Sequence, residues 1–111
     1  MNILQLREKR ATRRKRLSGL LPGKLLRQAS NVDLPCKLVD VTPHGLGVVS
    51  GAILEPGELL ALKMKNSEVL LEVAWGRPDF GKNDLYRYGL KVLTENCDLE
   101  AIFTACGLLE V

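Results

Sequence analysis

Two groups of polar side chains in this chain are spaced so that they could bind a ligand. The first is a corner between two apolar stretches, where Asp40, Thr42 and Gly45 offer a carboxylate, a hydroxyl and room for close approach. The second is an arginine pair, Arg10 and Arg14, in a basic N-terminal segment. Arginine forks grip phosphates and pair with the O6/N7 edge of guanine, whereas a carboxylate accepts from ring N–H and amine donors. Together the two groups suit a guanine nucleotide.

Each group also has a plainer interpretation. The corner pattern arises readily by chance and is typical of an Asx-type turn that joins two strands, with Gly45 supplying a positive φ. A charge run can equally be a solvated tail. Residues 1–16 carry seven basic side chains and one acidic one, and the remaining chain carries nine basic and twelve acidic ones. A basic arm therefore precedes a mildly acidic body, which indicates an anionic partner or an arm that folds onto the body.

Several classes of function are disfavoured. The chain lacks G-x-S-x-G, P-loop and H-E-x-x-H patterns, so no catalytic residue is predicted and we expect no enzyme activity. Three cysteines without C-x-x-C spacing and a single histidine argue against a metal site, and for reduced thiols in the cytoplasm. No apolar run approaches the roughly 20 residues of a membrane span, and no apolar segment follows the N-terminal charges. We expect a cytoplasmic protein without a cofactor.

Short apolar runs cut by turn residues predict six strands, over 20–26, 34–41, 46–49, 59–65, 68–77 and 85–93. The apolar period then becomes helical over 98–110, where Asn96 or Asp98 is expected to cap a helix. The expected fold is all-β with one helix: a six-stranded antiparallel β-barrel with a C-terminal α-helix against one open end. A flexible basic arm at 1–16 precedes this body at 17–111.

Two further side chains have alternative interpretations. Strand alternation places Trp75 on the same face as Val69, Leu71 and Val73, so we interpret it as a core or barrel-rim residue. Its alternative is a platform on which a base stacks. His44 is interpreted as an exposed turn residue, with a contact to ligand phosphate or base as the alternative.

The order of these motifs resembles the PilZ domain family over nearly the whole chain. The resemblance rests on the R-x-x-x-R of the arm, the D-x-[S/T]-x-x-G corner and several later stretches. These are Gly45-Leu46-Gly47-Val48, Pro56-Gly57, Val73-Ala74-Trp75 and Tyr88-Gly89-Leu90. It implies a six-stranded antiparallel barrel with an accompanying helix, and non-catalytic binding of the bacterial second messenger cyclic di-GMP.

Carried over by position, Arg10 and Arg14 match the two motif arginines, and the corner residues match Asp40, Thr42 and Gly45. Thr42 stands where the family has serine, and it keeps the hydroxyl while stiffening χ1. Arg13 and Arg16 also lie in the arm, so the register of the first motif is open. The resemblance implies an arm that closes over cyclic di-GMP and alters a surface offered to a partner protein in trans. The alternatives are a small barrel that binds nucleic acid, which the acidic body disfavours, and a ligand-free adaptor.

Overall fold

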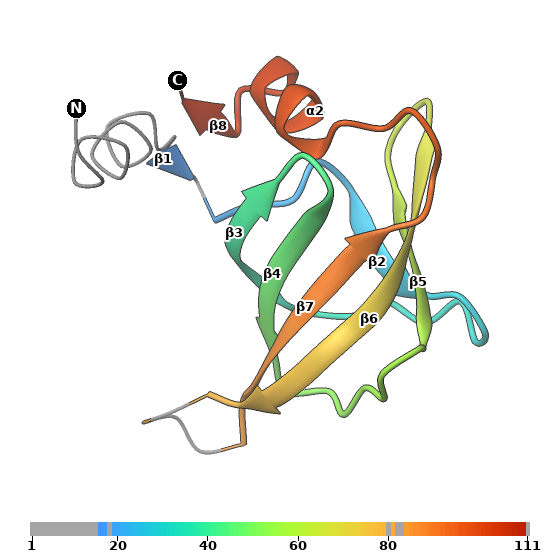
Figure 1. The fold of residues 1–111 in the computed structure, drawn as a ribbon, viewed down its shortest axis with the longest axis vertical. Helices are drawn as coiled ribbons and strands as arrows, with labels where there is room; N and C mark the ends of the chain where they lie inside the picture. Colours follow the sequence, from blue (N-terminus) through green and yellow to red (C-terminus); the bar gives the residue numbers. More distant parts are fainter. Residues whose placement is uncertain (1–15, 18, 80, 82–83, 111) are drawn as a thin grey trace, which may run out of the picture.

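The computed structural model of the protein describes residues 16–17, 19–79, 81 and 84–110. Six strands form one antiparallel sheet in the order β2-β5-β6-β7-β4-β3. The elements are β1 (Arg16–Leu17), β2 (Lys24–Arg27), β3 (Lys37–Thr42), β4 (Gly45–Ser50), β5 (Leu59–Lys63), β6 (Glu68–Pro78), β7 (Tyr86–Val92), α2 (Leu99–Ala105) and β8 (Leu109–Glu110). The sheet curls into a half-barrel with α2 at one end (Figure 1). The expected fold class, mostly β with one C-terminal helix, is confirmed.

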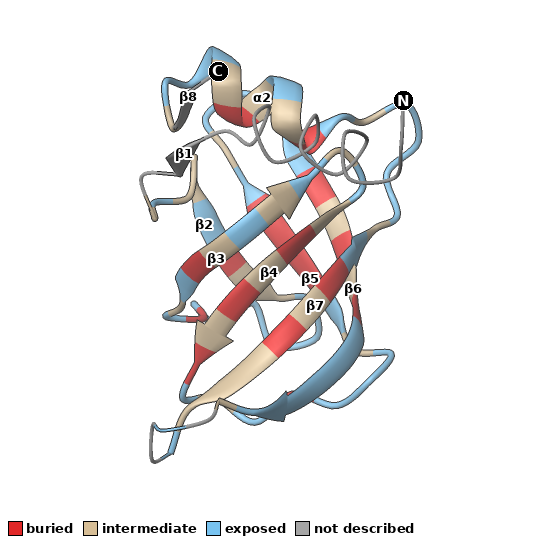
Figure 2. Ribbon diagram, turned by 60° about the vertical axis from the view of Figure 1, so that its left-hand side comes forward, coloured by how far each residue is buried: buried red, intermediate tan, exposed pale blue. Residues whose placement is uncertain are grey.

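The inner face of the half-barrel carries the hydrophobic core (Figure 2). Buried and less buried residues alternate along β4, where Leu46, Val48 and Ser50 point inward. This alternation is what a half-buried strand requires, since successive side chains project to opposite faces of the sheet. The residues between them, Gly45, Gly47 and Val49, therefore lie on the outer face.

Two strand boundaries differ from the predicted ones because of proline. Pro22 lies before β2, which begins at Lys24, because proline cannot donate to a strand ladder. The predicted strand 34–41 is divided at Pro35: the Leu34 N–H donates to the Leu25 carbonyl (2.8 Å), and β3 begins only at Lys37.

The helix closes one end of the core, as expected. Leu99 and Phe103, one turn apart, are fully buried. Asp98 is the N-cap, and its side chain accepts from the Ala101 N–H at 3.1 Å. The predicted C-terminal bound was wrong: α2 ends at Ala105, because the chain reverses at Gly107 with a φ of 75° and continues into β8. Positive φ at this position is the usual way for a helix to end.

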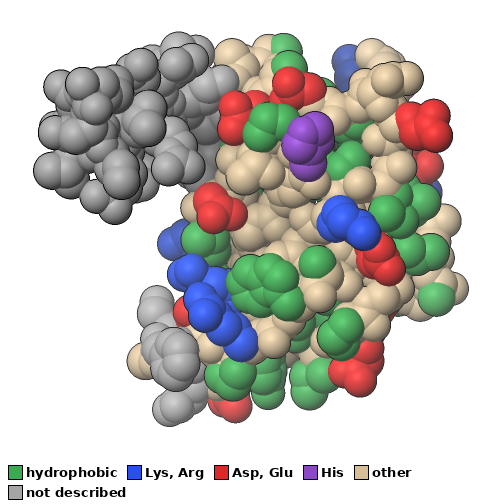
Figure 3. Space-filling model, in the orientation of Figure 1, with side chains coloured by type: hydrophobic (Ala, Val, Ile, Leu, Met, Phe, Trp, Pro, Cys, Tyr) green, Lys and Arg blue, Asp and Glu red, His purple; other side chains and the backbone are tan. Residues whose placement is uncertain are grey.

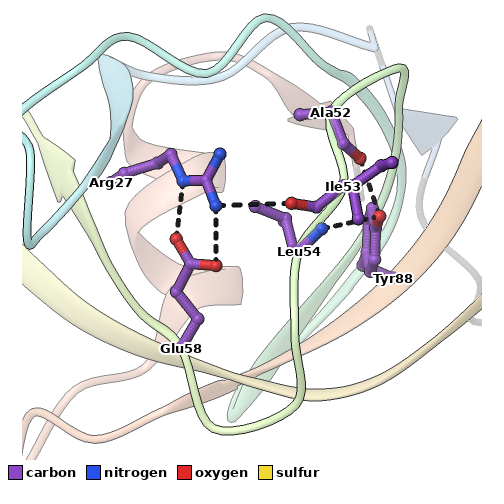
Figure 4. Close-up of polar contacts among 6 residues, drawn as sticks. All are labelled: Arg27, Ala52, Ile53, Leu54, Glu58 and Tyr88. Atoms are coloured by element: carbon purple, nitrogen blue, oxygen red, sulfur yellow. Dashed lines mark hydrogen bonds and ion pairs between the residues drawn. The ribbon is translucent and has the colours of Figure 1, made fainter.

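At the opposite end of the half-barrel, two side chains, Tyr88 and Arg27, form hydrogen bonds that stabilise the fold (Figure 4). The buried Tyr88 hydroxyl donates to the Ala52 carbonyl at 2.7 Å and accepts from the Leu54 N–H at 3.0 Å. The Arg27 guanidinium forms a bidentate pair with Glu58, at 2.6 and 2.9 Å. These contacts hold the connection between β4 and β5 against β7 and β2.

The three cysteines are free thiols, with Cys36 and Cys97 half-buried and Cys106 exposed. Cys106 is exposed because it lies at the C-cap of the helix. Burial, with a smaller contribution from the Asp33 carboxylate, raises the pKa of the Cys36 thiol to about 11.

Removal of the Tyr88 hydroxyl should destabilise the fold. In Tyr88→Phe the Leu54 N–H and the Ala52 carbonyl lose their shared partner, which should cost about 1–3 kcal/mol in the free energy of unfolding. Urea denaturation measures this value. Tyr86→Phe is the matched control, since its half-buried ring lies 6.3 Å from the Tyr88 ring and makes no hydrogen bond through its hydroxyl to the described residues. Equal losses in both variants would contradict this role for Tyr88.

The Cys36 thiol should make stability fall at alkaline pH. Its pKa is higher in the folded state, so the unfolded state ionises first and gains free energy as pH rises from about 9 to about 11. Because the thiol is only half-buried, the expected loss over this range is about 1 kcal/mol. Urea denaturation at pH 8 and pH 10.5 should show a drop that is larger for the wild type than for Cys36→Ala. A drop of the same size in both proteins would contradict the assignment.

Candidate functional site

The corner of the sequence is the turn between β3 and β4. Thr42 and Gly45 pair across it, which leaves Pro43 and His44 as its two central residues. The Thr42 Oγ1 accepts a hydrogen bond from the His44 N–H at 3.3 Å, so the threonine side chain stabilises this turn. The Thr42 hydroxyl is exposed and keeps its own hydrogen for an external acceptor.

Two β-bulges turn a pair of candidate site residues outward. In β3 the pairing with β4 skips Val39, between Leu38 and Asp40, and in β6 the pairing with β7 skips Ala74. With strict alternation, the Asp40 side chain would point inward like that of Leu38. One extra residue reverses the alternation, so the side chains that follow it point to the opposite face of the sheet. Both Asp40 and Trp75 are therefore on the outer face, and Trp75 is 44% exposed. Of the two interpretations of Trp75, as a core or a barrel-rim residue, the core interpretation was wrong for this reason.

The same registers align four residues across the outer face. Asp40 pairs with Gly47, Gly47 with Gly89, and Gly89 with Trp75. We call this set, which crosses β3, β4, β7 and β6, the glycine row. It spans three strand spacings, or about 14 Å between the outer Cα atoms. Figure 3 shows hydrophobic and basic side chains next to one another on one face of the molecule.

The two outer side chains lean over the two glycines. A Cβ added to Gly47 would overlap the Asp40 carboxylate, and one added to Gly89 would overlap the Trp75 indole. The carboxylate and the ring consequently lie over neighbouring strands with only backbone beneath them. Within the described ranges, no residue forms a hydrogen bond or ion pair with the Asp40 carboxylate. The row presents a carboxylate that no described residue pairs with, beside an aromatic side chain.

Gly45 has a different role from the expected one. Its φ is not positive, unlike that of Gly57 or Gly107. A Cβ at Gly45 would lie 2.7 Å from the Leu90 carbonyl oxygen, so glycine is required by the close approach of β7. Thr42 and Gly45 belong to the neighbouring outward row, which ends in the Lys91–Glu72 ion pair at 3.6 Å.

The remaining candidates are separate from the glycine row. His44 is exposed and lines a shallow pocket of about 420 Å³ together with Asn96 and Asp98, beside the start of α2. Arg10, Arg13 and Arg14 lie outside the described residues. The end of the basic segment is described: Arg16 in β1 pairs with Glu110 in β8, at the helix end of the half-barrel (Figures 1 and 2).

Four residues in or beside the glycine row were not among the predicted site residues: Gly47 and Gly89 in the row, and Arg77 and Arg87 beside it. The glycines had a readable signal, because a glycine inside a strand weakens it and often marks a place where a ligand approaches. The arginines had none, since their position beside Trp75 depends on the β6 bulge.

Comparison of the chain with protein-family models, curated proteins and solved structures finds no match. No helix among the described residues is long and apolar enough to cross a membrane. In the same part of the chain, no three His, Cys, Asp or Glu side chains are grouped so that they could hold a metal ion.

Alanine substitutions should separate the structural glycine from the site glycine. Gly45→Ala forces a methyl against the Leu90 carbonyl, and pushing two strand backbones apart should cost about 1–3 kcal/mol in the free energy of unfolding. Gly47→Ala meets only the end of the exposed Asp40 side chain, so the expected change is within about 0.5 kcal/mol. Urea denaturation of both variants tests this difference, and a loss in Gly47→Ala as large as that in Gly45→Ala would contradict it.

Proposed function

We propose that the protein is a non-catalytic receptor for cyclic di-GMP of the PilZ kind. The observation that carries the proposal is the outward placement of the Asp40 carboxylate and the Trp75 indole over the backbone of Gly47 and Gly89. Because the two glycines have no side chains of their own, the carboxylate and the indole lie close against the sheet, and a flat aromatic ligand can stack on the outer side of the indole. The carboxylate and the indole then supply direction and affinity.

The chemistry of the row favours guanine among the bases. Guanine carries two adjacent donors, the ring N1–H and the exocyclic amine, and a carboxylate accepts from both. Stacking on an aromatic side chain contributes about 1–3 kcal/mol per base. Because the indole lies over Gly89 and the carboxylate over Gly47, a base on the outer side of Trp75 can direct its donor edge toward Asp40. The Thr42 hydroxyl, two residues along β3, is a further donor beside the ligand.

The arm would supply the charges that a cyclic dinucleotide requires. Arg10 and Arg14 would bind phosphate and the O6/N7 edge of guanine, with Arg13 as the alternative register. The position of the root of the arm supports this role. The Leu99 N–H donates to the Pro43 carbonyl at 3.0 Å, so α2 starts against the β3–β4 turn, and β8 pairs with β1 shortly after α2 ends. The described end of the arm, in β1, thus lies at the same end of the half-barrel as the β3–β4 turn and Thr42.

Binding would order the arm over the outer face and change the surface that the protein offers to a partner. Charge-assisted contacts offset the entropy lost when the arm becomes ordered. The output in this proposal is a protein partner that acts in trans.

Isothermal titration with cyclic di-GMP should give saturable binding that depends on the glycine row. Asp40→Ala should weaken binding by about 1.5–3 kcal/mol, through the loss of hydrogen bonds to a charged group. Trp75→Ala should weaken it by about 1–3 kcal/mol through lost stacking. The matched controls are Glu55→Ala and Ile53→Ala, an exposed acid and an exposed apolar residue of the β4–β5 connection, and both should bind as the wild type does.

Three other outcomes would discriminate against the proposal. A folded sample that gives no heat at high micromolar ligand is not a cyclic di-GMP receptor. Tight binding to random RNA or DNA with a steep salt dependence would favour a nucleic-acid-binding barrel, since a polyelectrolyte releases counterions. Capture of a protein partner that is unaffected by cyclic di-GMP, in a chain that binds none, would favour the adaptor.

A further inference from the structure

A second outward row beside the glycine row carries an unusual concentration of positive charge. Arg77 of β6 and Arg87 of β7 are direct cross-strand partners, two residues along each strand from Trp75 and Gly89. Val49 of β4 pairs with Arg87, and Lys37 of β3 pairs with Val49. We call Lys37, Val49, Arg87 and Arg77 the arginine row. It lies on the same face as the glycine row, because the two rows are two residues apart along β4 and β7.

The geometry of the two arginines is unfavourable for a protein without a bound anion. Like charges directly opposite on neighbouring strands repel each other. Among the described residues, the buried Arg87 Nε has no hydrogen-bond partner, and its ion pair with the Asp79 Oδ1 is 3.8 Å long, too far for a hydrogen bond. The Arg77 guanidinium lies over the Trp75 ring, 5.4 Å from its centre, and so shares the stacking surface. In the same part of the chain, the ion pair with Asp79 is the one that involves the two arginines and Lys37.

We infer that the arginine row is an anion subsite that takes a phosphate of the nucleotide whose base lies on the glycine row. This inference rests on the proposed function and assigns one more part of the ligand. The two rows are about 7 Å apart, a separation that a single pentose bridges between base and phosphate. Two guanidinium forks provide the planar, paired donors that phosphate oxygens accept. The folded body therefore grips one phosphate without the arm.

A comparison of 5′-GMP with guanosine on the full chain tests the subsite directly. We expect the wild type to bind GMP at least about tenfold more tightly, because the phosphate adds charge-assisted hydrogen bonds. Chemical shift changes in backbone amides and in the arginine Nε–H groups report both affinities. Arg77→Gln and Arg87→Gln should each reduce the preference for GMP, and the double variant should abolish it. Lys65→Gln, an exposed lysine after β5, is the matched control and should keep the preference.

Arg87→Lys provides a variant that keeps the charge if Arg87→Gln fails to fold. It should lose most of the preference for GMP, because an ammonium cannot replace the planar fork. Equal affinity for GMP and guanosine in the wild type, or no shift with millimolar GMP, overturns the subsite. A preference that survives in Arg77→Gln and in Arg87→Lys overturns it as well, because the phosphate is then held elsewhere.

Cyclic di-GMP titrations of the same proteins separate this inference from the proposed function. If the wild type binds cyclic di-GMP and the arginine variants bind it equally well, the subsite is overturned and the receptor stands. If the wild type binds GMP with a preference that needs the arginines but does not bind cyclic di-GMP, the subsite stands for mononucleotides and the receptor falls.

Discussion

Two extra residues in the sheet, Val39 in β3 and Ala74 in β6, decide what the outer face of this protein can do. Each reverses the direction of the side chains that follow it, because a strand alternates sides with every residue. Without these bulges, Asp40 and Trp75 would point toward the leucine-rich interior, where an unpaired carboxylate is costly. With them, the carboxylate lies over Gly47 and the indole over Gly89, both on the outer face of the sheet.

The glycine row is compatible with a stable sheet because the hydrophobic core packs on the other face. Glycine inside a strand weakens the strand, since it offers no side chain to pack. Here the loss is confined to the outer face, while the inner positions between the glycines, Leu46 and Val48 on β4 and Tyr88 and Leu90 on β7, are all buried. Tyr88 also fastens the β4–β5 connection through its hydroxyl. The packing of the core therefore does not depend on the glycines of the outer face.

The fold also connects the proposed ligand site with the C-terminal helix. The β3–β4 turn accepts a hydrogen bond from the first residue of α2, and the strand after α2 pairs with the residues that end the basic segment. A ligand held by both the arm and the outer face would therefore act on the helix end of the half-barrel. This arrangement gives the proposed change of surface a defined location.

Local patterns in the sequence were sufficient for the fold class, the six strands of the sheet and a helix cap at Asn96 or Asp98, of which the structure shows Asp98. Alternation, turn residues and caps act over a few positions, which is why they can be read locally. They also singled out Asp40, Thr42 and Gly45. They could not reveal the bulges, since a bulge is a mismatch of register between two strands and depends on the partner as much as on the strand itself. The outward Trp75, the glycine row and the opposed Arg77 and Arg87 follow from those registers. Tertiary pairing alone brings residues from four strands onto one face, so only the folded structure determined the site.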